Sequence, residues 1–271
     1  MGYKIGIVEW AFPFPGPYGL KIAAELGLQG MELDFGDYET GFKLYHPKIR
    51  QAYLECGEAY GIAFPSIALN ALNAHGMSND RNTADGMIAI ETIQKGIETA
   101  QEMHIPVVQL PSFDNGDIRT EQDFYNTCEK VRFACDLAKG SDLVIAVENV
   151  LDAEQTKRML REVNSDKLKV FFDTQNYYLD RGYSQPELLN EIAQDVVQVH
   201  VKDGYNRTIS SALLGRGDVS FRKTAEVILR TGCTEWLFLE NYYNRKPLSL
   251  LHSDMFELIR EDVRTLRSIF S

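Results

Sequence analysis

Four side chains that could bind a metal ion stand at the ends of four apolar runs in the second half of the sequence. They are the carboxylates Glu148, Asp173 and Glu240 and the imidazole His200. An imidazole on a buried strand is costly unless it is bound, so a ligand or a hydrogen-bond partner is expected beside it. Carboxylates and imidazole are donors for one hard or borderline divalent cation, such as Mn²⁺, Mg²⁺, Co²⁺ or Zn²⁺. A thiolate site is excluded, because no cysteine ends any of these runs.

Each of these residues also has a plainer interpretation. Asp173 could cap a turn, Glu240 could form a surface ion pair, and His200 could be a core histidine bonded to the backbone. Glu148 fits such an interpretation less well, because it directly follows the apolar run 143–147. If the plainer interpretations held for all four residues, their positions at the ends of four successive strands would be four separate coincidences. The sequence therefore predicts a metal site.

The four runs belong to an even alternation of strand and helix patterns, which implies parallel strands joined by right-handed crossovers. Eight such units in about 250 residues are the size of a closed (β/α)₈ barrel, or TIM barrel. We therefore predict a single-domain barrel over residues 1–271, with a doubly wound open sheet as the alternative. The C-terminal strand ends of a barrel meet at one mouth, which would bring the four side chains together. Seven of the predicted strands are 3–8, 30–35, 63–69, 106–110, 143–148, 168–173 and 236–240. The remaining strand is the apolar run that begins at residue 196 and contains His200.

The helices after the fifth, sixth and seventh of these strands carry start signals. Asp152, Ser184 and Ser220 stand just before three of them and are expected to be their N-caps.

Composition restricts the partners and the compartment. The formal net charge of -11 and the lack of a Lys/Arg cluster argue against nucleic acid as a partner. No apolar stretch approaches the length that spans a membrane, and the first residues are not typical of a secretory signal. The four scattered cysteines form no Cys-x-x-Cys pair, which suggests reduced thiols. We therefore expect a cytoplasmic protein without disulfides.

Five motifs around the candidate ligands carry a family resemblance, which is sharpest between residues 144 and 243. The sequence resembles the sugar-phosphate isomerase/epimerase superfamily, whose members share a xylose-isomerase-like barrel. Within it, the L-xylulose-5-phosphate 3-epimerase and hexulose-6-phosphate isomerase group is the most similar. The Gly-x-Gly-x-Val-x-Phe spacing is the most telling motif, because barrel geometry alone does not demand it. The motifs are 147–149 (VEN), 172–176 (FDTQN), 199–203 (VHVKD), 214–221 (LGRGDVSF) and 239–241 (LEN).

The resemblance implies what the four residues would do. Glu148, Asp173, His200 and Glu240 would hold the metal ion, and the two glutamates would also be the acid/base pair on either side of the substrate. A cation between the carbonyl and the neighbouring hydroxyl stabilises the enediolate that forms when a proton leaves. Return of the proton to the other face inverts the carbon, and return to the adjacent carbon interconverts aldose and ketose. The implied protein is an isomerase or epimerase of a ketose or ketose phosphate, and a homodimer or homotetramer like its relatives.

Three further residues near these motifs are candidates for substrate binding. Lys202 points the same way as His200 along its strand and could contact a substrate oxygen or phosphate, or else pair with Asp203. Arg216 could hold an anionic substrate or be a solvated loop residue. Many relatives have a histidine where this sequence has Asn176, and asparagine is what the phosphate-using relatives have.

Three more candidates lie outside the motifs. His75, in the stretch 73–76, resembles a histidine that lines the pocket in relatives. Trp10 could form an apolar wall behind the sugar together with Phe12, or simply pack in its loop. Glu154 matches a substrate-contacting acid of some epimerases, although its place in the first turn of a helix explains an acid there nearly as well.

Two other functions share the expected barrel. A phosphodiesterase like the apurinic endonuclease would need several more histidines for a zinc cluster, and the sequence has five histidines in all. A sugar- or polyol-binding protein without catalysis would usually have lost one of the four candidate ligands. The intact set therefore favours the enzyme.

Overall fold

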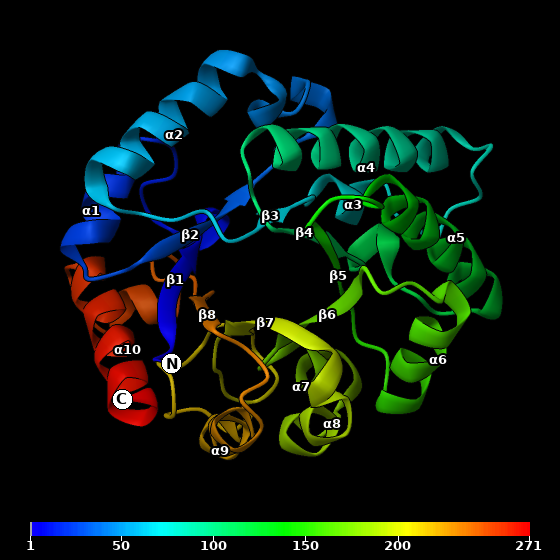
Figure 1. The fold of residues 1–271 in the computed structure, drawn as a ribbon. Helices are drawn as coiled ribbons and strands as arrows, with labels where there is room; N and C mark the ends of the chain where they lie inside the picture. Colours follow the sequence, from blue (N-terminus) through cyan, green and yellow to red (C-terminus); the bar gives the residue numbers. More distant parts are fainter. Residues whose placement is uncertain (1) are drawn as a thin grey trace. The chain divides into compact units, whose positions relative to one another are not determined.

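A computed structural model of the protein describes residues 2–271. Eight parallel strands follow one another in the order β1 to β8, and β8 pairs with β1 to close a barrel (Figure 1). A helix follows every strand before the next one begins. This confirms the predicted (β/α)₈ barrel and excludes the doubly wound open sheet. The strands are β1 Lys4–Val8, β2 Gly30–Asp34, β3 Ile67–Ala68, β4 Val107–Pro111, β5 Val144–Glu148, β6 Leu168–Asp173, β7 Val196–Val201 and β8 Trp236–Leu239.

The described chain forms two compact units, which we call unit 1 and unit 2. Unit 1 contains residues 2–32, 55–63 and 171–271, and unit 2 contains residues 33–54 and 64–170. The single domain predicted from the sequence stays a prediction.

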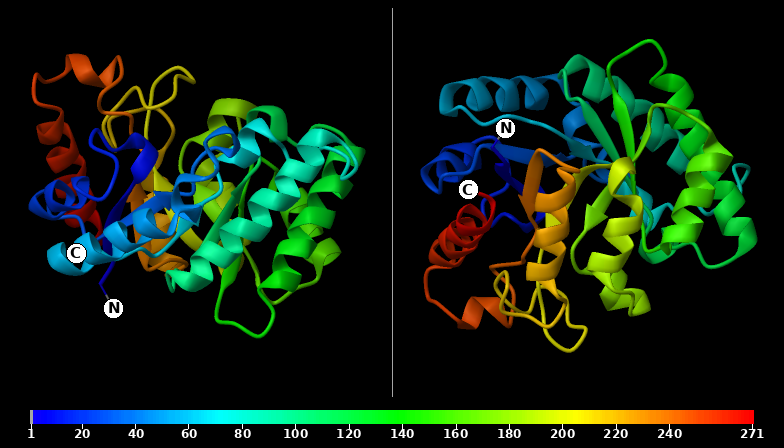
Figure 2. Two further views of the ribbon diagram at one scale, coloured as in Figure 1. Left: turned by 90° about the horizontal axis from the view of Figure 1, so that it is seen from above. Right: turned by 60° about the horizontal axis from the view of Figure 1, so that its bottom comes forward.

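Unit 1 contains β1, β7, β8, most of β2 and the end of β6. Its helices are amphipathic, and α9 buries Phe221, Ala225 and Ile228 while it exposes its charged residues. Helices α8 and α9 pack side by side (Figure 2). The helices of unit 1 are α1 Gly19–Glu25, α7 Asn176–Arg181, α8 Gln185–Ile192, α9 Phe221–Thr231 and α10 Met255–Phe270.

Unit 2 contains β3, β4, β5 and the start of β6. Helix α4 packs on β4 and on α5, and α5 packs in turn on β5 and α6 (Figure 1). The first turn of α5 has a complete capping box between Thr120 and Asp123. The helices of this unit are α3 Ala71–Ala74, α4 Ala84–Glu102, α5 Glu121–Leu137, α6 Ala153–Val163 and most of α2 Pro47–Tyr60.

Local signals in the sequence were partly right about helix starts. Asp152 caps α6, because its side chain accepts a hydrogen bond from the Gln155 N–H. Ser184 and Ser220 stand at the N-cap positions of α8 and α9 as predicted, but the expected capping is wrong, since neither side chain makes a capping hydrogen bond. Ser220 has a φ of 62°, in the left-handed region, and an N-cap needs extended backbone to aim its hydroxyl at the helix. The third strand is also shorter than predicted, with two residues.

Alternation along the strands of unit 1 sets which side chains share a face. His200 on β7 pairs in register with Phe238 on β8, and both are 0% exposed. Lys202 lies two residues further on, so it follows His200 on the same face. Gly6 on β1 leaves space for the Phe238 ring, which would lie 2.6 Å from a Cβ at that position. A large side chain on one strand is thus accommodated by a glycine on its neighbour.

Two expectations about the rest of the chain can be compared with the structure. The four cysteines are free, as predicted. Within residues 2–271, no helix has both the length and the apolar character needed to span a membrane.

Candidate active site

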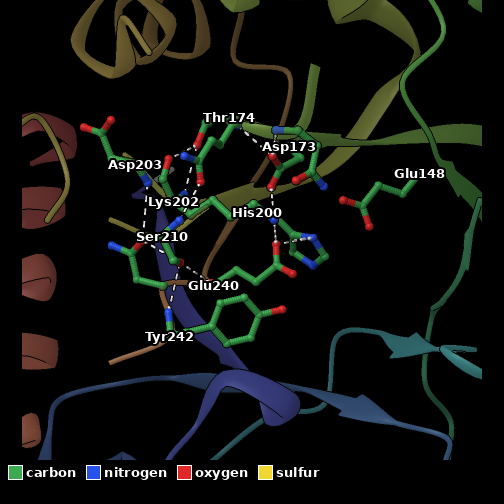
Figure 3. Close-up of polar contacts among 12 residues, drawn as sticks. Glu148, Asp173, Thr174, His200, Lys202, Asp203, Ser210, Glu240 and Tyr242 are labelled. Carbon is green, nitrogen blue, oxygen red and sulfur yellow. Dashed lines mark hydrogen bonds and ion pairs between the residues drawn. The ribbon is translucent and has the colours of Figure 1, made fainter. Parts of the chain in front are cut away.

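Lys202 lies between two of the predicted metal ligands in unit 1. Its ammonium Nζ is 2.6 Å from Glu240 Oε2 and 3.2 Å from Asp173 Oδ2 (Figure 3). The three buried side chains stand at the ends of β7, β8 and β6. Thr174 ties the ends of β6 and β7 together, because its hydroxyl donates to the Lys202 carbonyl and accepts from the Lys202 N–H. Charge-assisted contacts of this kind hold all three side chains in place.

The imidazole of His200 has a carboxylate beside each of its nitrogens. Nε2 lies 2.5 Å from Glu32 Oε2, and Nδ1 lies 3.3 Å from Glu240 Oε2. The ring also packs against Phe171, with 4.3 Å between the ring centroids. His200 and Glu32 are both 0% exposed, so packing and hydrogen bonding together restrict the ring to one orientation.

Glu240 has a donor on each carboxylate oxygen. Oε1 accepts a hydrogen bond from the Trp10 indole Nε1 at 3.1 Å, and Oε2 accepts one from Lys202. The indole also meets the His200 ring edge to face, with 5.6 Å between centroids. Trp10 therefore contacts two of the predicted ligands, while its role as an apolar wall stays a prediction.

Asp173, His200 and Glu240 form a buried cluster with the donor chemistry of a metal site. One ligand atom of each lies within 4.8 Å of the others. Asp173 Oδ1 accepts two backbone N–H groups at the start of α7. Burial raises the pKa of Asp173, and the Lys202 ammonium acts in the opposite direction. A carboxylate buried this deeply needs positive charge beside it, so the cluster suits a divalent cation.

Glu148 ends β5 in unit 2 and is buried there. The side-chain amide of Gln109 on β4 donates a hydrogen bond to Glu148 Oε2. Gln109 pairs in register with Ala146, two residues before Glu148, so the two side chains lie on the same face of the sheet. A neutral amide thus orients this carboxylate, whereas an ammonium and an indole orient Glu240.

The Gly-x-Gly stretch after β7 surrounds the carboxylate of Asp203. Asp203 Oδ2 accepts from the N–H groups of Gly215 at 2.8 Å and Gly217 at 3.0 Å. Oδ1 accepts from the Gly204 N–H at 2.8 Å. A Cβ on Gly217 would lie 2.0 Å from Oδ1, so only glycine allows this close approach. These backbone N–H groups bind an anion of the chain itself, and the motif therefore shapes the loop beside the site.

Asp262 of α10 anchors the residues that follow β8. Its Oδ2 accepts from Asn241 Nδ2 and from the Tyr243 hydroxyl, both at 2.8 Å, and its Oδ1 accepts from the Leu214 N–H at 2.8 Å. The side chain of Asn241 in turn accepts from the Asp203 N–H at 3.3 Å. One buried hydrogen-bond network thus connects three parts of unit 1, namely the end of β8, the loop that follows β7, and helix α10. Burial raises the pKa of Asp262 to about 7, although the three donors oppose that shift.

This pKa predicts a pH dependence of stability. From its ordinary 3.8 up to about 7, the carboxyl is ionised in the unfolded chain but still protonated in the fold. Its contribution to the free energy of unfolding therefore falls as the pH rises through that range, by up to about 1.4 kcal/mol per pH unit. Urea unfolding of wild type and Asp262→Asn measures this change. The difference in their free energies of unfolding should decline from about pH 4 to about pH 7 and should stay constant at higher pH. Parallel pH curves for the two proteins would contradict this expectation.

Comparison with known proteins decides the family. The sequence profile of the xylose isomerase-like TIM barrel family matches residues 20–269. The chain belongs to this family. The 2-epi-5-epi-valiolone 7-phosphate 2-epimerase of Actinoplanes sp. is 29% identical over 259 residues, which cover 94% of this chain and 93% of that protein.

Solved structures of two sugar epimerases resemble the fold of this xylose isomerase-like chain. D-psicose 3-epimerase from Clostridium cellulolyticum has a TM-score of 0.78 at 14% identity, with 99% of each chain covered. The 3-keto-D-glucoside 4-epimerase from E. coli has a TM-score of 0.75 at 15% identity, with 98% of this chain and 99% of that chain covered. Together with the family match, these findings confirm the predicted resemblance and the predicted class of enzyme, an isomerase or epimerase.

Two of the other predicted substrate-binding residues of this family member lie in unit 1. Asn176 is buried at the start of α7, where its N–H donates to Asp173. Arg216 is exposed and forms an ion pair with Glu261 of α10. The side chain of Arg216 is thus engaged on the helix next to it, and its contact with a substrate stays a prediction.

Two more predicted residues lie in unit 2. His75 Nδ1 is 2.8 Å from Asp85 Oδ1, and its Nε2 is 3.0 Å from Glu39 Oε1. The hydrogen bond to Asp85, followed by that to Glu39, raises the pKa of His75 against the effect of burial. Glu154 is exposed in the first turn of α6. His75 therefore links the segment around Glu39 to α4, and contact of either residue with a substrate stays a prediction.

Three residues that orient this site were not singled out from the sequence. Glu32 and Gln109 each interrupt an apolar strand, which is the same signal that drew attention to Glu148. Asp262 lies on the apolar face of α10, four residues from Leu258. A polar residue inside a buried periodic pattern was thus the available signal in all three cases.

Proposed function

We propose that this protein is a divalent-metal-dependent epimerase or isomerase of a ketose or ketose phosphate. The observation that carries the proposal is the buried cluster of Asp173, His200 and Glu240 in a barrel of this family. The epimerases named above support it, since one is named for a phosphorylated substrate and two for sugars.

The donor set fits a divalent cation, because two carboxylates and an imidazole are hard or borderline ligands. We propose that Glu148 joins Asp173, His200 and Glu240 as the fourth ligand. It is a buried carboxylate at the end of β5, and β5 neighbours β6 in the closed strand order. When bound, Mn²⁺, Mg²⁺, Co²⁺ or Zn²⁺ supplies a Lewis acid that stabilises negative charge on the substrate oxygens as the proton leaves.

Glu148 and Glu240 are the proposed acid/base pair. One carboxylate removes the proton from the carbon next to the carbonyl, and the other returns a proton to the opposite face. Gln109 orients the first carboxylate, and Trp10 and Lys202 orient the second. Return of the proton to the adjacent carbon would give aldose–ketose isomerisation at the same site.

The remaining parts of the proposal concern the substrate and the assembly. We propose a small sugar or sugar phosphate as the ligand, manganese as a suitable native metal, a cytoplasmic location and a homodimer or homotetramer. The candidates for substrate contact are Trp10, His75, Glu154, Asn176, Lys202 and Arg216.

Exchange of deuterium from solvent tests this function directly. The metal-freed protein is incubated in D₂O with a panel of pentuloses, hexuloses and their phosphates, with and without Mn²⁺, and the products are followed by NMR. We expect deuterium at the carbon next to the carbonyl, together with a new epimer or isomer, only when the metal is present. Failure of every ketose to exchange with any of the four metals would contradict the proposal, as would Mn²⁺- or Zn²⁺-dependent nicking of an abasic DNA duplex.

A further inference from the structure

We infer that Glu32 is a positioning residue that sets the tautomer and the orientation of His200. The inference rests on the proposed function, since it takes His200 to be a metal ligand through one of its two nitrogens. Glu32 belongs to β2 and His200 to β7, and both lie within unit 1.

The contact between the two side chains is short and fully buried. His200 Nε2 lies 2.5 Å from Glu32 Oε2, and neither side chain has exposed surface. An ionised carboxylate can only accept a hydrogen bond, so with Glu32 ionised the proton between the two atoms belongs to Nε2. A buried carboxylate without such a donor would be costly, which makes this arrangement self-consistent.

A neutral imidazole has one N–H and one lone pair, so a proton on Nε2 leaves the lone pair on Nδ1. Nδ1 is the nitrogen that faces Glu240, at 3.3 Å from its Oε2. The free lone pair therefore points toward the side chains that could share a cation with it. Among the described residues, the group of ligand-type side chains includes Asp173, His200 and Glu240 but not Glu32. Glu32 thus acts through the histidine and not as a ligand itself.

Carboxylates that hold the second nitrogen of a ligating histidine raise its basicity and fix its ring plane. Here the ring is also packed by Phe171 and met edge to face by Trp10. These aromatic contacts restrict rotation of the ring, but they do not distinguish one nitrogen from the other. Only a hydrogen-bond acceptor can select the tautomer, and carboxylates lie beside both nitrogens. Glu32 is the closer acceptor, at 2.5 Å from Nε2. Glu240 Oε2 is 3.3 Å from Nδ1 and already accepts from Lys202, so Glu32 favours the proton on Nε2.

The first experiment measures the tautomer in the metal-free protein. Selective ¹⁵N labelling of the five histidines gives few signals, and His200 is assigned by its loss in His200→Gln. In wild type we expect His200 to carry its proton on Nε2. In Glu32→Leu we expect a mixture of tautomers or a proton on Nδ1, and in Glu32→Gln, whose amide oxygen can still accept, an intermediate result. An unchanged His200 tautomer in both variants would overturn the inference.

The second experiment measures metal affinity by calorimetric titration with Mn²⁺ and Co²⁺. Loss of an outer-shell partner of this kind weakens binding by about 10- to 100-fold, so we expect that loss in Glu32→Leu and a smaller one in Glu32→Gln. We propose no substrate contact for Glu32, so the kinetic effect at saturating metal should be small. If Glu32→Leu fails to fold, Glu32→Gln alone carries the test.

Glu9→Gln is the matched control. Glu9 is also buried, at 1% exposure, and follows the neighbouring strand β1, but its carboxylate accepts from the Gly16 N–H. We expect this variant to keep both the His200 tautomer and the metal affinity. An equal loss of affinity in Glu9→Gln and Glu32→Gln would assign the effect to net charge and overturn the inference. The tautomer measurement needs neither metal nor substrate, so it can hold even if the proposed function fails.

Discussion

Replacement of Glu148 or Glu240 by glutamine is expected to lower epimerase turnover by about 10²–10⁴-fold at saturating Mn²⁺. Glutamine keeps the length and the shape of the side chain, but its amide cannot take up a proton at neutral pH. In Glu148→Gln the Gln109 amide loses its charged acceptor, and in Glu240→Gln the Lys202 ammonium does. Both changes therefore remove a proposed proton carrier while they leave most of the packing intact.

The two variants should also differ from each other in a way that a nonspecific defect would not produce. If each glutamate serves one face of the reacting carbon, the remaining carboxylate can still remove and return a proton on its own face. Glu148→Gln should then exchange deuterium into one epimer without inverting it, and Glu240→Gln should do the same with the other epimer. NMR of each purified epimer in D₂O measures both rates.

Glu162→Gln is the control for the first prediction. Glu162 lies on α6 in the same unit as Glu148, but its side chain is exposed and pairs with Arg132. We expect unchanged turnover and exchange in this variant. If both epimers kept full exchange and inversion in Glu148→Gln, the assignment of Glu148 as a proton carrier would be wrong.

Replacement of Lys202 by methionine should destabilise the metal-free protein strongly. The ammonium lies within 3.2 Å of both Asp173 and Glu240, and its side chain is only 2% exposed. Removal of one partner from a buried ion pair leaves the other charges without compensation, at a cost of about 3–5 kcal/mol. Urea or thermal unfolding of the metal-freed protein measures this loss.

Added metal should reverse much of that destabilisation. A divalent cation brings positive charge to the same two carboxylates, so Lys202→Met should regain stability on addition of Mn²⁺ to a greater extent than wild type does. The variant should also bind Mn²⁺ more tightly, because no ammonium beside the carboxylates repels the ion. Calorimetric titration gives the two dissociation constants.

Lys130→Met separates this effect from the loss of any buried lysine. Lys130 on α5 is also buried, at 1% exposure, but its Nζ donates to the backbone carbonyl of Asn79 at 2.6 Å. Its replacement should cost the same stability with and without Mn²⁺. If Mn²⁺ restored Lys202→Met no better than Lys130→Met, the ammonium of Lys202 would not be the counter-charge of a metal site.

Lys202 also shows how far alternation along a strand can guide an interpretation. The pairing of Lys202 with Asp203 was one expectation from the sequence, and the structure pairs Lys202 with Glu240 and Asp173 instead. Consecutive residues of a strand point to opposite faces, so neighbours in the sequence are poor candidates for a side-chain contact. Asp203 turns to the other side and accepts the N–H groups of the Gly-x-Gly loop.

The amino-acid sequence by itself determined the barrel and the positions of the strand ends, because both follow from local patterns. Apolar runs of strand length alternate with amphipathic helices, and a polar residue that closes such a run is visible without any tertiary information. Asp173, His200 and Glu240 were found in this way, and the structure brings all three into one buried cluster.

Only the tertiary structure decided which side chains orient that cluster. Glu32 and His200 are 168 residues apart, and Trp10 and Glu240 are 230 apart, so no local pattern links them. Closure of the sheet pairs β1 with β8 and thereby brings the first and last strands of the chain together. The closed barrel sets the distances and angles between side chains on different strands. Hydrogen bonds between residues far apart in the sequence therefore become visible only in the folded structure.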